Sequence, residues 1–306
     1  MKITIIGAGN VGSLSAMRIA SSGLGDVFLI DVIEGLAHGK ALDLEDARPL
    51  LKYNYNIYGT DDIGQIRDSD IVVITAGIAR KPGMSREELL SKNSQILKGI
   101  CLNVKELAKK AIVIVVTNPL DIMTFYALKI TRFKPARVFG MGISLDTARF
   151  VNLIAGELNL PITDVEALVI GAHGENMLPL PSFAKVKGVC LDEFLSDDKI
   201  QSLVSRTISR GAEIVANLGT GSAFFAPAAA IEAIVRTIIK DEKRNLGLCC
   251  YLNGQYGIKD TCIGVLCRLG KDGIEQVIEI DLSQEEKVKL VKSANLVATA
   301  TAQLFA

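Results

Sequence analysis

The reaction chemistry that this sequence offers centres on one histidine. His173 lies in "GAHGEN" (171–176), directly after an apolar run, and is one of only 2 histidines in 306 residues. An imidazole exchanges a proton near neutral pH, so a histidine at the end of a strand is a candidate general acid and base. The other one, His38, falls within a helical pattern, and we interpret it as a surface or packing residue.

An acid and an arginine stand three residues apart in "LDTAR" (145–149), on one face of an expected helix. One interpretation is a surface ion pair between Asp146 and Arg149, worth a few tenths of a kcal/mol. The other is that Arg149 binds a substrate carboxylate as a bidentate fork while Asp146 orients a histidine. Asn118 in "TNP" (117–119) follows another apolar run, where its amide either donates to a substrate oxygen or caps a turn.

Two further arginines lie in "ARKPGMSREELL" (79–90), where a Pro-Gly pair indicates a loop that could act as a lid. Ser85 and Glu88 have the spacing of a capping box, so Arg86 falls in the first turn of a helix. A cation there opposes the helix dipole, and a bound anion would offset that cost. The alternative is that Arg86 pairs with a neighbouring glutamate or solvent. Arg80 strengthens the case for an anion clamp.

A glycine pattern near the N-terminus predicts a dinucleotide site. "GAGNVG" (7–12) follows a strand-like run and opens a helix, which is the context that the motif requires. Gly7 would make the tight turn, Gly9 would let the backbone approach a pyrophosphate, and Gly12 would allow close helix–strand packing. Asp31 ends the next strand, 19 residues after Gly12, where a carboxylate can bind ribose hydroxyls and repel a 2′-phosphate. NAD is therefore favoured over NADP, with FAD, a regulatory NAD sensor and an unrelated glycine turn as alternatives.

The elements that must position these residues alternate in the first half of the chain. β-Branched, apolar runs indicate strands covered on both faces, and the patterns between them indicate helices. The runs are 2–7, 26–31, 54–60, 70–77 and 111–119, with helical patterns at 10–23 and 34–51. Helical crossovers imply a parallel sheet. We therefore predict an α/β fold whose N-terminal part, residues 1–143, is a Rossmann doubly wound parallel sheet.

The pattern changes in the second half. We expect a C-terminal α+β substrate domain with antiparallel strands over residues 144–306, because strand-like runs after residue 244 are joined by "KDG" (271–273), a hairpin turn signal. The other expected elements are helices at 145–158, 192–218, 227–239 and 283–304 and a strand at 165–174.

Composition excludes several classes of partner. Lys plus Arg and Asp plus Glu both total 34, so no basic bias favours nucleic acid or an anionic membrane. We find no apolar run of about 18 residues and no pattern typical of a signal peptide, and we expect a cytoplasmic protein. The 6 cysteines form no CxxC pair, so we expect buried, reduced thiols and no metal site.

Seven segments, in order along the whole chain, resemble the lactate/malate dehydrogenase family of NAD-dependent 2-hydroxy acid dehydrogenases. They are "GAGNVG", "ARKPGMSR", "TNPLD", "LDTARF", "GAHGEN", "GSAFFAPAAA" and "YGIKD". The stretch "ARKPGMSREELLSKN" is similar to malate dehydrogenases of the lactate-dehydrogenase-like branch. The resemblance implies that His173 donates and accepts the proton, with Asp146 as its partner. It also implies that Arg149 grips the proximal carboxylate, Arg86 polarises the carbonyl, Arg80 meets a distal carboxylate and Asn118 binds substrate.

The same resemblance implies NAD as the cofactor and a homo-oligomer, with a tetramer favoured over a dimer. The residues expected along the NAD are Gly7, Ala8, Gly9, Asn10, Val11, Gly12, Asp31, Asn93, Val116, Thr117 and Asn118. Because three arginines can serve two carboxylates and one carbonyl, the expected reaction interconverts L-malate and oxaloacetate. The alternatives are a lactate or other 2-oxoacid dehydrogenase and a non-catalytic NAD-binding regulator.

Overall fold

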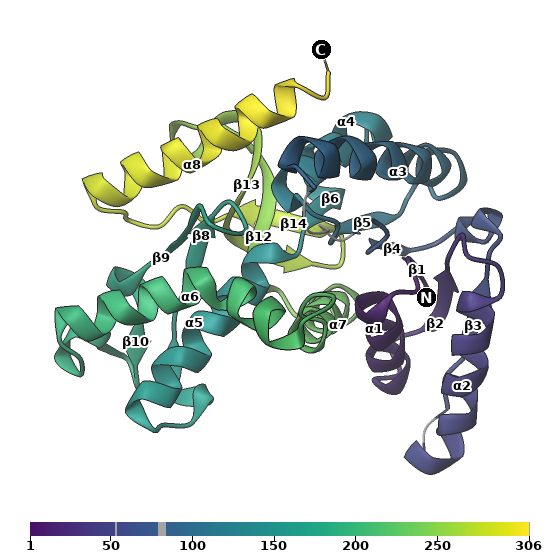
Figure 1. Cartoon of the computed structure of the whole chain (residues 1–306), viewed down its shortest axis with the longest axis horizontal. Helices are drawn as coiled ribbons and strands as arrows, with labels where there is room; N and C mark the ends of the chain where they lie inside the picture. The colour runs from purple at the N-terminus through teal and green to yellow at the C-terminus, as the bar shows by residue number, and fades with distance from the viewer. Residues whose placement is uncertain (53, 79–83, 306) are drawn as a thin grey trace.

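A computed structural model of the chain describes residues 1–52, 54–78 and 84–305. The N-terminal part contains six parallel strands in the order β3-β2-β1-β4-β5-β6, with helices on both faces (Figure 1). The strands are β1 (Lys2–Ile6), β2 (Asp26–Ile30), β3 (Ile57–Thr60), β4 (Ile71–Ile74), β5 (Ile112–Val115) and β6 (Val138–Gly140), and the helices are α1 (Asn10–Ser21), α2 (Leu36–Leu51), α3 (Arg86–Leu107) and α4 (Leu120–Thr131). The predicted doubly wound parallel sheet is confirmed.

Alternate residues of the central strands pack toward opposite helical layers. Ile71 and Val73 of β4 belong to a core with α1 and α2, whereas Val72 and Ile74 belong to a core with α3 and α4. This is why the strands are apolar throughout, as the sequence indicated.

The second half adds antiparallel strands and four long helices. The helices are α5 (Gly142–Leu158), α6 (Asp197–Leu218), α7 (Phe225–Ile239) and α8 (Gln284–Ala302), and the strands of the main sheet are β8 (Val169–Gly171), β9 (Met177–Pro179), β12 (Arg244–Asn253), β13 (Lys259–Gly270) and β14 (Gly273–Val277). A small separate sheet contains β7 (Val165–Glu166), β10 (Lys185–Val186) and β11 (Val189–Cys190). Short 3₁₀ helices cover Ile63–Ile66, Pro135–Arg137, Ile162–Asp164, Pro181–Phe183, Leu191–Glu193 and Gln255–Gly257.

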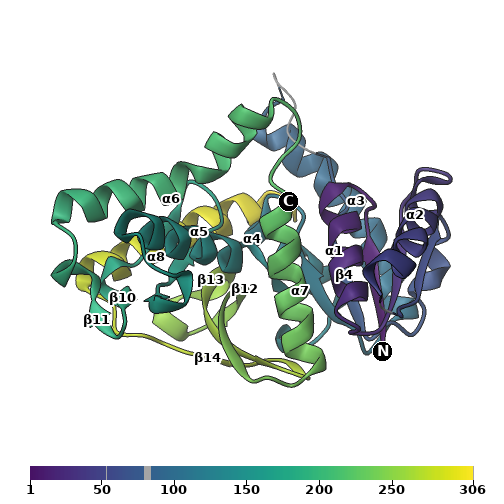
Figure 2. The same cartoon turned by 90° about the horizontal axis from the view of Figure 1, so that it is seen from below.

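In the part of the chain that the structure describes, one continuous sheet of 11 strands runs through both halves. Its parallel and antiparallel parts meet where β6 lies beside β12, with Gly140 opposite Cys249. A side chain at Gly140 would not fit, because its Cβ would lie 2.6 Å from the Thr124 hydroxyl and 3.1 Å from Cys249 Cβ. Helix α7 also joins the halves, since it packs beside α1 (Figure 2) and its buried Glu232 accepts from Ser22 at 3.2 Å.

Most expected elements of the second half are confirmed, including the hairpin, which joins β13 to β14. The strand expected over 165–174 was wrong as a single element. Its first part, β7, pairs with β10 in the small sheet, and its second part, β8, pairs with β13 and β9 in the main sheet. Gly171, with φ +87°, ends β8 before the histidine. The helix expected from residue 192 begins at Asp197, after Ser196 as N-cap.

The environments of the side chains follow the expectations with one exception. Cys190 is exposed, whereas the other cysteines are buried as expected. His38 is exposed on α2. Among the helices of the described residues, none has both the length and the apolar character needed to cross a membrane.

Candidate active site

His173, Asp146 and Arg149 meet at one buried carboxylate. His173 Nδ1 lies 2.6 Å from Asp146 Oδ2, and Arg149 Nη1 donates to Asp146 Oδ1 at 3.0 Å. The Asp146 side chain has no solvent exposure, and those of His173 and Arg149 are 16% and 11% exposed. Asp146 therefore both pairs with Arg149 and contacts a histidine, which the sequence offered as alternatives. The ion pair is buried, however, and does not lie on the surface. Because Nδ1 faces Asp146, Nε2 is the ring nitrogen left for a substrate.

The charges around His173 favour its protonated form. Burial by itself would lower the pKa of the imidazole. The carboxylate of Asp146, and to a smaller degree that of Asp121, outweigh burial and the opposing charge of Arg149, so the pKa of His173 lies above its usual value. The ring is thus biased toward carrying the proton that a reduction consumes.

Helix α5 carries Asp146 and Arg149, and it packs very close to the sheet. Gly264 on β13 makes this approach possible, because a Cβ there would lie 2.0 Å from Ile143 Cγ1. Thr147 on the same helix accepts from Val169 N of β8 at 3.1 Å. The strand that leads to His173 and the helix that carries Asp146 are therefore fixed to each other.

Gly142, the first residue of α5, leaves the space that the imidazole occupies. A Cβ at this position would lie 2.8 Å from both Cβ and Cγ of His173 and 3.1 Å from Nδ1. Nothing in the sequence pattern singled out this glycine, because its reason is a contact with a residue 31 positions away.

The guanidinium of Arg149 has donor capacity beyond the bond to Asp146. Its Nε is buried, and no acceptor among the described residues pairs with it. Gly211 of α6 lies against the guanidinium, where a Cβ would be 3.6 Å from Nη1. A shielded arginine with remaining donors suits the binding of a carboxylate.

Two residues without a role in the sequence analysis hold the histidine loop. Asp121 of α4 accepts from His173 N at 2.8 Å. Ser293 of α8 accepts from Ala172 N at 3.0 Å and donates to Asn176 O at 2.9 Å. Asp121 stands in the quoted segment "TNPLD", but only the tertiary structure brings it to the loop, and no pattern pointed to Ser293.

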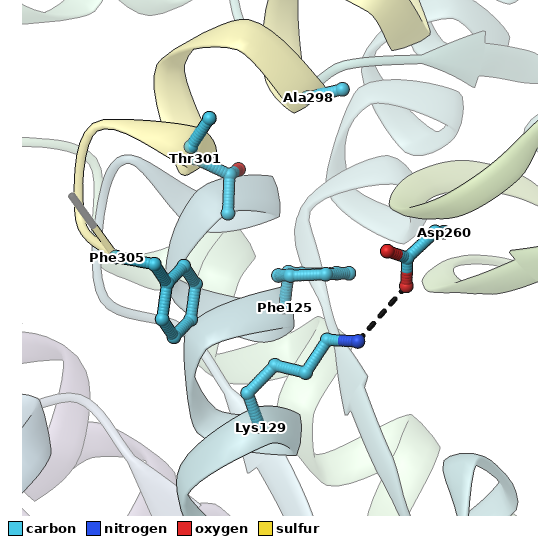
Figure 3. A pocket seen from close by; sticks show the side chains of 7 residues that line it. Phe125, Lys129, Asp260, Ala298, Thr301 and Phe305 are labelled. Atoms are coloured by element: carbon cyan, nitrogen blue, oxygen red, sulfur yellow. Dashed lines mark hydrogen bonds and ion pairs between the residues drawn. The ribbon is translucent and has the colours of Figure 1, made fainter.

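The helices that carry Asp121 and Ser293 pack against each other near the end of the chain. Phe305, which follows α8, contacts the ring of Phe125 on α4 at 6.3 Å between centroids (Figure 3). A surface pocket lies beside this contact, and its Lys129 and Asp260 form an ion pair at 2.9 Å with each other. The pocket shares no lining residue with the histidine site.

The glycine-rich loop has the geometry that the dinucleotide motif requires. Gly7 has φ +107°, and a Cβ on it would lie 2.6 Å from Ala76 N. A Cβ on Gly12 would lie 1.8 Å from Gly7 O, whereas one on Gly9 would meet no atom of the described residues within 4 Å. Gly7 and Gly12 are thus required by the protein itself, and Gly9 borders open space. Among the described residues no side chain caps the N-terminus of α1, so its first N–H groups remain for an anion such as a pyrophosphate.

Asp31 lies beside this loop, at the end of β2. Its Oδ2 accepts from Ala8 N at 2.6 Å, and its Oδ1 accepts from Ile33 N at 3.0 Å. Lys40 Nζ donates to Ala8 O at 2.5 Å. The carboxylate is held rigidly at the loop, and each oxygen still has a lone pair for a ribose hydroxyl.

The other residues expected near the cofactor join the carboxyl ends of β4 and β5. Asn93 accepts from Ile78 N at 2.8 Å and donates to Asn118 O at 2.7 Å. Thr117 donates to Ala76 O at 2.6 Å, and the neighbouring Val116 continues the pairing with β4. Asn93 is 1% exposed, so its side chain ties the two loops together, whereas Asn118 is exposed at the rim.

The expected arginines of the 79–90 segment are only partly placed. Arg80 and the side chain of Arg86 lie outside the described residues. The backbone of Arg86 opens α3, and the expected capping box is present, since Ser85 and Glu88 each accept from the other's backbone N–H.

Replacing Gly142 should damage catalysis without unfolding the protein. In Gly142→Ala the methyl group would push the ring of His173 away from Asp146, and we expect the NADH-dependent turnover number to fall by about tenfold or more. Gly156→Ala in the same helix is the matched control, because a Cβ there meets nothing within 4 Å. It should keep its turnover and gain up to about 1 kcal/mol of stability. Equal turnover in the two variants, measured by NADH absorbance, would remove the steric argument.

Replacing Gly9 should weaken cofactor binding selectively. Gly9→Ala creates no clash with any residue that the structure describes, so its melting temperature should stay close to that of the parent. The methyl group would occupy the approach to the pyrophosphate, and we expect the Kd for NADH to rise about tenfold, or ~1.4 kcal/mol. Fluorescence titration with NADH measures this, with Gly99→Ala on α3 as the control, since a Cβ there also meets nothing within 4 Å. The same Kd in both variants would argue against a pyrophosphate at this loop.

Comparison with known proteins agrees with this architecture. Residues 1–140 match the lactate/malate dehydrogenase NAD binding domain, and residues 143–305 match the lactate/malate dehydrogenase alpha/beta C-terminal domain. The chain is 46% identical to a malate dehydrogenase of Methanosarcina acetivorans over 99% of both sequences. It also resembles the crystal structure of Cryptosporidium parvum malate dehydrogenase, with a TM-score of 0.96, 39% identity and coverage of 99% of this chain and 98% of the other.

A lactate dehydrogenase has nearly the same structure. That of Cryptosporidium parvum, solved with lactic acid and the nicotinamide cofactor, gives a TM-score of 0.96 at 36% identity, covering 99% of this chain and 97% of the other. The two family matches together cover both halves of the chain, so the chain belongs to the lactate/malate dehydrogenase family.

Proposed function

We propose that this protein is an NAD-dependent malate dehydrogenase that interconverts L-malate and oxaloacetate. The observation that carries the proposal is the buried contact of Asp146 with both His173 and Arg149, which joins an acid–base group to a carboxylate-binding group. The relatives named malate dehydrogenase, at 46% identity over nearly the full length, support this substrate. NAD would lie along the glycine-rich loop and Asp31, and when bound it supplies the hydride acceptor or donor.

His173 would carry the proton in both directions. In reduction, Nε2 of the imidazolium donates a proton to the carbonyl oxygen of oxaloacetate. In oxidation, the neutral ring takes the hydroxyl proton of malate. Asp146 holds Nδ1, which fixes the tautomer and stabilises the imidazolium, as a triad aspartate does.

Each of the three arginines would interact with a different group of the substrate. Arg149 binds the carboxylate beside the reacting carbon, where its orientation is fixed by Asp146. Arg86 would polarise the carbonyl, and Arg80 would meet the second carboxylate. Asn118, at the rim, would donate to a substrate oxygen.

Two alternative functions would require fewer of the charged residues than this proposal does. A lactate dehydrogenase would not need Arg80, because lactate lacks the second carboxylate. A non-catalytic NAD-binding regulator would not need the buried contacts of Asp146, which cost free energy to assemble. The complete set of charged groups therefore favours a dicarboxylate dehydrogenase.

The direct test is oxidation of NADH by the purified protein with oxaloacetate or pyruvate. We expect kcat/KM to favour oxaloacetate strongly and NADH to be preferred over NADPH, because Asp31 repels a 2′-phosphate. His173→Asn should lower kcat by about two to four orders of magnitude while NADH still binds. Activity with pyruvate alone would favour the lactate alternative, and full activity of His173→Asn would exclude this histidine.

Selectivity for the dicarboxylate should depend on Arg80. Arg80→Gln should lower kcat/KM for oxaloacetate and raise it for pyruvate, because an enclosed cation without a partner is penalised. A charge-assisted pair of about 1.5–3 kcal/mol corresponds to a change of roughly 10- to 150-fold in the ratio of kcat/KM for oxaloacetate to kcat/KM for pyruvate. Arg149→Ala is the comparison, since it should impair both substrates. A ratio that changes by less than about threefold would show that Arg80 is not the discriminator.

We also propose a cytoplasmic homo-oligomer, a tetramer rather than a dimer. Exposed apolar side chains on α8, namely Val288, Val291 and Leu296, support association, because such a cluster gains free energy when a partner subunit covers it. Light scattering at assay concentration gives the subunit number.

A further inference from the structure

A second carboxylate lies behind the histidine and takes no part in the mechanism above. Asp121, in the first turn of α4, is 4% exposed and accepts from His173 N through Oδ2. Its Oδ1 is buried, and no nitrogen or oxygen of the described residues donates to it. Besides the amide of His173, only the thiol of Cys249 bonds to this carboxyl, and a buried carboxyl with such weak pairing is costly.

The hydrogen bond to the loop does not by itself require a charge. Ser293 makes the equivalent bond to the preceding amide, that of Ala172, with a neutral hydroxyl. A neutral acceptor at position 121 would serve His173 N in the same way and would avoid burying an ion. The difference between Ser293 and Asp121 is therefore electrostatic.

The groups that face Asp121 come from three elements and from the loop after β8. They are Cys249 of β12, Cys262 of β13, Asp146 of α5 and His173 itself. Cys249 offers only a thiol, which is a weak donor. Of these groups only His173 can be positively charged, so a negative Asp121 has one cation to stabilise.

Asp121 is ionised where His173 titrates. Burial raises the pKa of Asp121 to about 6, although Cys249 and the charge and amide of His173 pull it down. Its helix N-terminus also favours the anion. Since the pKa of His173 lies above 6.5, the imidazole loses its proton in a range where Asp121 is already negative.

We propose that Asp121 is a positioning residue that anchors the peptide of His173 and, through its negative charge, keeps the imidazole protonated for ketone reduction. This inference rests on the proposed acid–base role of His173. It assigns the two carboxylates different tasks, because Asp146 holds the ring itself and Asp121 acts from the backbone side.

The test separates charge from geometry with two variants. Asp121→Asn keeps an oxygen acceptor and the shape but removes the charge, whereas Ser293→Ala removes loop hydrogen bonds but no charge. Both are made in a His38→Gln background, which leaves His173 as the single histidine, because the chain has only 2. NMR of the labelled imidazole then reports the protonation of His173 directly, without any turnover.

We expect the titration midpoint of His173 to move to lower pH in Asp121→Asn and to stay in place in Ser293→Ala. In the reduction assay, Asp121→Asn should lose about three- to tenfold in kcat/KM for oxaloacetate on the alkaline side. Well below pH 6 its kcat/KM should approach that of the parent, because the carboxyl of Asp121 in the parent is then protonated and position 121 is uncharged in both proteins. Ser293→Ala should instead lower kcat by a similar factor at every pH.

An unchanged midpoint in Asp121→Asn, or a loss of activity that is the same at every pH, would overturn the electrostatic role. If the parent protein does not reduce oxaloacetate, the proposed function fails, but the imidazole titration still decides the coupling. If Asp121→Asn does not fold, the parent provides a second measurement. The amide N–H of His173 donates a hydrogen bond to Asp121, so its NMR chemical shift should change with pH near the Asp121 pKa of about 6. An amide chemical shift that stays constant through that range would overturn the proposal.

Discussion

The site depends on one buried carboxylate that has two partners. An isolated carboxylate as deep as Asp146 would cost several kcal/mol, and the ion pair with Arg149 and the bond to His173 offset that cost. Both partners must therefore be brought to the same residue. The close approach of α5 at Gly264, the missing side chain at Gly142 and the position of Gly211 beside Arg149 all serve this one contact.

The charges near His173 also limit what can bind. With the imidazole protonated, His173 and Arg149 balance Asp146 and Asp121, so the described groups sum to zero. A dicarboxylate adds two negative charges that these groups do not neutralise. On the proposed function, Arg80 and Arg86 supply the matching positive charges, and a monocarboxylate would leave one of them unpaired. Substrate choice would then follow from charge balance as much as from shape.

Sequence patterns predicted those parts of the structure that depend on local order. The apolar runs located the parallel strands, the glycine spacing located the dinucleotide loop, and the i,i+3 spacing placed Asp146 and Arg149 on one face of α5. Relationships across the fold were not predictable in this way. Asp121 bonds to an amide 52 residues away, Ser293 bonds to one 121 residues away, and the division of 165–174 into two strands depends on which partners each part finds. These contacts follow from tertiary packing, and no local spacing encodes them.

The sheet that passes from β6 to β12 has a consequence for folding. Its hydrophobic core is shared as well, since Ile5 and Ala16 of the first half belong to the same cluster as Val235 and Ile263 of the second. Neither half can expose its edge of the sheet without losing part of that core. We therefore expect the two halves to unfold together in one cooperative transition. A destabilising change far from the glycine-rich loop, for example on α7, would then reduce NAD binding by lowering the population of folded molecules rather than through any contact with the cofactor.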